Sequence, residues 1–206
     1  MREENPNKRL EMFSDGVFAI AITLLIIEIK VPALNLMGST SDVWNATIHL
    51  WPSFFALFLS FILIFISWYG HHVLFDALDK ASDRFLFASG FFLLTVVILP
   101  FPTAFMAEYL NTLYAQPANV FYSFCCLVHN LGWRLLLNST KKPKQLAKSP
   151  EHIQKINEAM RSNRMGTIAS VAILVLSWWF PYIALIISLI LWSFWIYVSS
   201  KIKRKF

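Results

Sequence analysis

The sequence predicts an all-α integral membrane protein with six membrane-spanning helices in each chain. Hydrophobic residues make up 57% of the 206 residues, and the mean hydropathy is +0.55. Several apolar runs approach the ~20 residues that a helix needs to cross a bilayer, and a soluble domain of this size does not carry several such runs. Residues 1–206 are therefore expected to form a single transmembrane domain.

Prolines and polar links divide the apolar sequence into six segments. Pro32 ends the first segment, the loop at residues 33–45 has a turn composition, and Pro100 kinks the third segment or ends it early. Residues 157–161 are predicted to form an amphipathic helix that leads into the fifth segment, and Pro181 turns the chain into the sixth. The predicted spans are residues 9–31, 47–74, 85–106, 118–137, 165–180 and 182–200.

The basic residues predict how these spans are oriented. Six spans put both termini on one side, and 17 of the 18 Lys and Arg residues fall on that side, leaving Lys30 on the other. The positive-inside rule then predicts cytoplasmic termini and a location in the inner (plasma) membrane of the cell. Anionic lipid in the inner leaflet accounts for the net charge of +6, so the expected partner is the bilayer and not a nucleic acid.

The first span carries the most informative polar residues, because a carboxylate inside a span is costly and points to function. At ~100° per residue, Ile20, Leu24 and Ile27 fall within about 60° of one another, with Phe13 on the same line and Thr23 at its flank. Ser14 and Asp15 point ~120–140° away from Ile20, toward neighbouring helices. On geometry alone, the aliphatic line is expected to face lipid or core.

The same span carries a recognisable motif. Arg9-x-x-x-Phe13-Ser14-Asp15, followed by the apolar run at residues 16–25, resembles the first-helix signature of the endosomal and lysosomal transmembrane potassium channel family. The length and the six-span layout resemble its bacterial branch. The resemblance implies a homotetramer whose first helices line a central pore, with bulky aliphatic side chains in place of a carbonyl selectivity filter.

The resemblance also implies roles for particular residues of the first span. Ile20, Leu24 and Ile27 correspond to the pore constriction, and Thr23 lies beside them as a candidate selectivity residue. The implied activity is a potassium-selective cation channel, weakly selective over sodium, with K⁺ as the permeant ion and no cofactor. The alternatives are a small membrane carrier and a proton-conducting channel.

Asp15 is expected to need a partner on another helix, because Arg9 lies ~120° around the same helix. His71 and His72 end the second span at the matching depth, although they also suit a simple hydrated helix end. The resemblance implies a hydrogen-bond network with histidine and tryptophan from other helices, for which Trp68 and Trp192 are further candidates. The predicted structural network is Arg9, Phe13, Ser14, Asp15, His71 and His72.

Other classes of function find little support in the sequence. The sequence contains no HExxH or Gly-x-Ser-x-Gly motif and no phosphate-binding glycine loop, so an enzyme is not expected. His49, His129 and His152 lie on different segments, which argues against a metal centre. A Thr-Val-Gly-Tyr-Gly filter and a pair of interrupted spans are both missing, so a channel of this kind must select through helix side chains in a symmetric oligomer.

Overall fold

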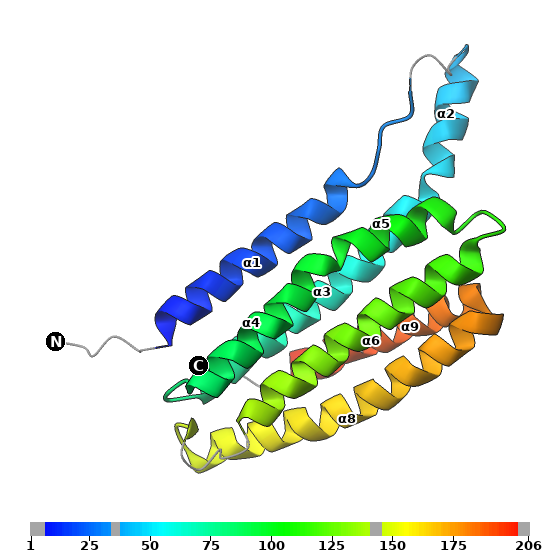
Figure 1. Cartoon of the computed structure of the whole chain (residues 1–206). Helices are drawn as coiled ribbons and strands as arrows, with labels where there is room; N and C mark the ends of the chain where they lie inside the picture. Colours follow the sequence, from blue (N-terminus) through cyan, green and yellow to red (C-terminus); the bar gives the residue numbers. More distant parts are fainter. Residues whose placement is uncertain (1–6, 34–37, 141–145, 202–206) are drawn as a thin grey trace.

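The computed structural model describes residues 7–33, 38–140 and 146–201, and these residues are almost entirely helical (Figure 1). Its helices are α1 (Lys8–Ile27), α2 (Thr40–His49), α3 (Trp51–Ala77), α4 (Asp83–Ile98), α5 (Pro100–Tyr109), α6 (Ala115–Ser139), α8 (Pro150–Trp179) and α9 (Pro181–Lys201). The long helices run side by side in a bundle, and α1 lies along one edge of it, packed on α3 and α4.

The helix that follows the first span was not expected. Thr40–His49 forms α2, although the sequence pattern predicted a loop as far as residue 45. Ser39 explains the difference, because its hydroxyl accepts from the Asp42 amide while the Asp42 carboxylate accepts from the Ser39 amide. This capping box satisfies amide groups that a helix start would otherwise leave unpaired. α1 is also shorter than predicted, because it ends at Ile27 rather than at residue 31.

Proline positions shape the remaining helices in two ways. The predicted third span is divided into α4 and α5 at Leu99, directly before Pro100, as the prolines indicated. The predicted fifth span and the amphipathic helix before it form one continuous 30-residue helix, α8, which begins at Pro150 and ends before Pro181. Proline is favoured at the first position of a helix because its missing N–H group needs no partner there.

Five helical stretches in the described part of the chain are long and apolar enough to span a bilayer. They are Lys8–Ile27, Thr40–Ala77, Asp83–Tyr109, Ala115–Ser139 and Pro181–Val198. The first half of α8 is polar, and its apolar half at residues 165–179 is shorter than a typical span. The fifth predicted span corresponds to this half, which packs along α6 (Figure 1).

Hydrogen bonds gather three chain segments at one end of the bundle. The Asn7 side chain, at the start of α1, accepts from the Ala81 amide at 2.7 Å. The Asp79 amide donates to the Leu146 carbonyl at 2.7 Å, which joins the α3–α4 link to the segment before α8. The beginning of α1, the α3–α4 link and the segment before α8 therefore lie at the same end of the molecule.

Candidate pore-lining helix

The α1 helix has one buried face and one exposed face. Ser14, Phe18, Ala21 and Leu25 are at most 2% exposed, at the three- and four-residue spacing that places them on one side of a helix. The opposite side presents apolar side chains outward: Ile20 is 61% exposed, Leu24 38% and Ile27 70%. A single chain therefore leaves an apolar stripe of α1 uncovered.

Thr23 adds a polar atom beside this stripe. Its side chain is exposed, and its hydroxyl donates to the Ile20 carbonyl at 2.9 Å. A hydroxyl that donates to the backbone keeps oxygen lone pairs free to accept a hydrogen bond or to approach a cation. Thr23 thus offers an outward-facing oxygen at the level of the apolar stripe.

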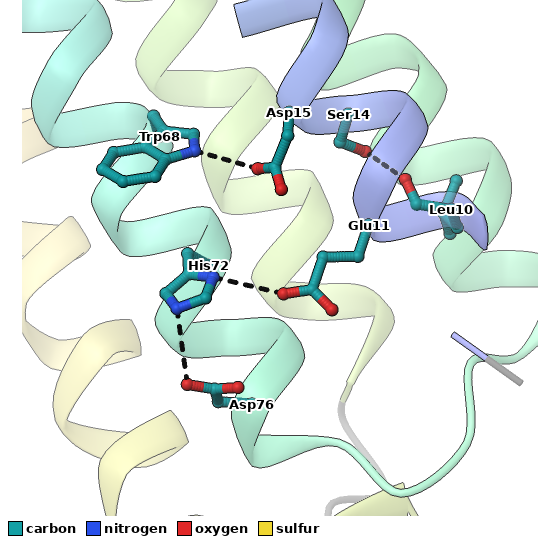
Figure 2. Close-up of polar contacts among 7 residues, drawn as sticks. All are labelled: Leu10, Glu11, Ser14, Asp15, Trp68, His72 and Asp76. Atoms are coloured by element: carbon teal, nitrogen blue, oxygen red, sulfur yellow. Dashed lines mark hydrogen bonds and ion pairs between the residues drawn. The ribbon is translucent and has the colours of Figure 1, made fainter. Parts of the chain in front are cut away.

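Asp15 anchors the other side of α1 to α3. Its carboxylate accepts a hydrogen bond of 2.9 Å from the Trp68 indole N–H, and both groups are partly buried (Figure 2). Trp68 was the less favoured candidate partner in the sequence, and neither His71 nor His72 bonds to Asp15. Ser14 is fully buried, and its hydroxyl donates to the Leu10 carbonyl of its own helix at 2.8 Å.

The two histidines at the end of α3 face different surroundings. His71 is fully buried, lies 3.2 Å from the Ser89 hydroxyl of α4, and packs edge-on against the Phe18 ring with centroids 5.4 Å apart. His72 is partly exposed and lies 3.1 Å from the Glu11 carboxylate. Each histidine therefore joins α3 to a neighbouring helix, but at separate places.

The remaining candidates lie away from this contact. Arg9 and Phe13 are exposed at the start of α1, and Arg9 forms no ion pair within the described residues. Trp192 packs against Tyr122, with ring centroids 6.4 Å apart, in a separate core cluster. The structure therefore brings together Asp15 and Trp68, and separately His72 and Glu11.

Buried polar side chains in the bundle form a second group, which the sequence reading had not connected. His129 on α6 lies 2.7 Å from the Ser67 hydroxyl of α3 and 2.9 Å from the Thr95 hydroxyl of α4. Small polar residues that bond across helices hold membrane bundles together where no hydrophobic driving force acts between helices. The isolated polar residues within apolar spans were the available signal for this contact.

The long apolar helices of the fold define a helical membrane protein. A sequence model described as "Endosomal/lysosomal potassium channel TMEM175" matches residues 9–100, which include α1 and the polar contact with α3. This match, together with the relatives and solved structures below, supports membership of that family, as the sequence motif of α1 had indicated.

Relatives and solved structures agree with this assignment. A protein named as a potassium channel from Chamaesiphon minutus is 34% identical over 142 residues, which cover 64% of this chain and 66% of that protein. A potassium channel of Streptomyces collinus is 44% identical over 52% of this chain and 50% of its own length. The matched part is slightly less than two thirds of the Chamaesiphon minutus protein and half of the Streptomyces collinus protein.

The structural likeness extends further along the chain. The crystal structure of a lysosomal potassium-selective channel TMEM175 homolog from Chamaesiphon minutus superposes with a TM-score of 0.85 at 29% identity, over 95% of this chain and 99% of that chain. A variant of the potassium channel MtTMEM175, bound to a nanobody fusion, shares the fold with a TM-score of 0.63 at 19% identity, over 93% of this chain and 90% of its own.

Proposed function

We propose that the chain is one subunit of a potassium-permeable channel whose pore is lined by the exposed face of α1. The observation that carries this proposal is the division of α1 into an anchored face and an uncovered apolar face at Ile20, Leu24 and Ile27. One chain cannot enclose a pore with a single helix. A symmetric assembly, for which we propose four copies, brings the α1 faces together around one axis.

The constriction in this proposal is apolar. Rings of Ile20, Leu24 and Ile27 offer a cation no oxygen ligands to replace its hydration shell, so a narrow ring of this kind closes the pore by dewetting. Thr23 supplies hydroxyl oxygens beside these rings and is the proposed origin of a weak preference for K⁺ over Na⁺. K⁺ is the proposed permeant ion.

A potassium gradient across liposomes tests this function directly. Vesicles that contain the purified protein and K⁺, in a Na⁺ solution, should develop an inside-negative membrane potential because K⁺ leaves faster than Na⁺ enters, and empty vesicles should not. A flux that saturates and requires a counter-ion would favour a carrier. A pH gradient that collapses in the absence of K⁺ would favour a proton-conducting channel.

Removal of the Thr23 hydroxyl gives the first prediction. Thr23→Ala should lower the preference for K⁺ over Na⁺ with a smaller effect on the total flux, because it removes an oxygen ligand and leaves the apolar rings in place. The reversal potential in mixed K⁺ and Na⁺ measures the preference. Thr47→Ala is a matched control, since Thr47 is also an exposed helical threonine bonded to its own backbone, but on α2. Equal preference in the Thr23 variant and the wild type would contradict the role of this hydroxyl.

Orientation in the membrane gives the second prediction. We propose cytoplasmic termini in the inner (plasma) membrane, supported by Lys8, Lys80 and Lys148, which lie on the segments joined at one end of the bundle. In a background in which Cys125 and Cys126 are replaced by serine, a membrane-impermeant maleimide should label Leu113→Cys in intact cells. It should label Lys148→Cys only after lysis, because the α5–α6 link and the segment before α8, which carry these exposed positions, lie at opposite ends of the bundle (Figure 1). Labelling of Lys148→Cys in intact cells would overturn this orientation.

A further inference from the structure

Three potential metal ligands meet where α1 crosses α3 (Figure 2). Glu11 belongs to α1, and His72 and Asp76 lie one turn apart on α3. The Glu11 carboxylate lies 3.1 Å from His72 Nδ1, and the Asp76 carboxylate lies 3.6 Å from His72 Nε2. One ligand atom from each of the three residues can be chosen so that all lie within 4.8 Å of one another.

The spacing of these atoms suits a small divalent cation. Ligands that lie ~2.1 Å from a tetrahedral zinc ion are about 3.4 Å apart, close to the observed separation of His72 Nε2 and Asp76 Oδ2. Glu11 lies against the other ring nitrogen, Nδ1, and joins the same ion after a side-chain rotation. One imidazole and two carboxylates favour borderline metals such as Zn²⁺, Co²⁺ and Ni²⁺, whereas Mg²⁺ and Ca²⁺ prefer oxygen ligands alone.

All three side chains are accessible to solvent. The side chains of Glu11 and His72 are 23% and 29% exposed, and that of Asp76 is 63% exposed, so a hydrated ion can reach the site and keep a water ligand. His72 also stacks near Trp68, with ring centroids 6.0 Å apart, and Trp68 holds Asp15. The imidazole therefore lies directly beside the other contact between α1 and α3.

We propose that Glu11, His72 and Asp76 form a binding site for a divalent transition metal that clamps α1 to α3. The effect on transport rests on the proposed function, in which α1 lines the pore. Glu11 precedes Ile20 by nine residues on a continuous helix, which is about 13 Å along the helix axis. A metal that binds only when α1 and α3 are in contact favours the conformation with that contact, and so restricts movement of the pore-lining helix.

Metal binding is tested first, on tag-free purified protein in detergent. Co²⁺ should give the visible absorption of a tetrahedral complex, and Zn²⁺ should displace it. Glu11→Gln, His72→Ala and Asp76→Asn should each weaken Zn²⁺ binding at least about tenfold, since even the loss of an outer partner costs ~10–100-fold in metal affinity. His49→Ala is the matched control, because His49 is an exposed histidine on α2 whose ring bonds to the Asn45 carbonyl of its own helix.

Each outcome of these binding measurements either supports the proposed metal site or overturns it. Asp76 is the most exposed of the three, so Asp76→Asn keeps the fold intact if the other two variants fail to assemble. Loss of Zn²⁺ binding in Asp76→Asn, with binding retained in His49→Ala, supports the site. Absence of Co²⁺ and Zn²⁺ binding to the wild type, or equal binding in wild type and Asp76→Asn, overturns it.

Ion flux then tests the clamp. Zn²⁺ should slow K⁺ flux through wild-type vesicles, and Asp76→Asn should abolish this slowing. Zinc binding without any change of flux would overturn the clamp and leave the metal site established. Vesicles that pass no K⁺ even without zinc would refute the proposed function, whereas the binding measurement would still decide the metal site.

Discussion

Replacement of Ile20 by asparagine should raise cation flux about tenfold and weaken the preference for K⁺ over Na⁺. Asparagine offers polar atoms where the proposed ring is apolar, so it lowers the cost of bringing a hydrated ion through the constriction. A tenfold increase corresponds to a barrier lowered by about 1.4 kcal/mol. Liposome flux measurements in K⁺ and in Na⁺ provide the test, with size-exclusion chromatography to verify assembly.

A matched substitution separates a pore effect from a general effect of polarity. Ile190 on α9 is 63% exposed, almost the same as Ile20 at 61%, but lies on a helix that the proposal keeps out of the pore. Ile190→Asn should leave flux and selectivity unchanged. Wild-type flux and selectivity in an assembled Ile20→Asn protein would show that this part of α1 does not line the pore.

Replacement of Asp15 by alanine should reduce the yield of assembled protein far more than it alters ion preference. The substitution removes the acceptor of the Trp68 N–H bond and leaves that donor unpaired in a partly buried contact. A hydrogen bond to a charged group contributes about 1.5–3 kcal/mol, less than the loss expected for a buried ion pair. The yield and the melting temperature in detergent measure the effect.

Conservative variants test whether the lower yield of assembled protein comes from the loss of this hydrogen bond. Asp15→Asn retains an acceptor oxygen and should be milder than Asp15→Ala, and Trp68→Phe should reproduce the alanine phenotype because it removes the donor. The double variant should be little worse than either single one, since both remove the same bond. A stable Asp15→Ala oligomer with altered selectivity would instead place Asp15 in the conduction path.

The sequence predicted the helical layers and the two faces of α1 because apolar length and helical periodicity are local properties. Ser14 is buried and Ile20 is exposed, as the angles around an ideal helix indicated. α2 was missed because its mean composition resembles a turn, and the capping pair Ser39 and Asp42 was the only strong signal of a helix start. Local pattern therefore predicted the long elements better than the short one.

The polar contacts between helices were harder to predict, because they depend on how each helix is rotated against its neighbour. His71 and His72 differ by ~100° around α3, so depth in the membrane alone does not decide which faces α1. In the structure, His72 contacts Glu11 and His71 contacts Ser89. Trp68, one turn earlier on α3, donates the hydrogen bond to Asp15. Glu11 was not considered from the sequence, since its role appears only once α1 and α3 are packed.

Thiol modification at Ile20 tests the central claim, that the exposed face of α1 lines the conduction path, most directly. Ile20→Cys and Ile190→Cys are prepared in the background in which Cys125 and Cys126 are serine, and K⁺ flux through liposomes is recorded before and after a small charged thiol reagent. Modification should change flux through Ile20→Cys and leave Ile190→Cys unaffected. Unchanged flux through Ile20→Cys, with mass spectrometry showing that the thiol has reacted, would contradict a pore lined by α1.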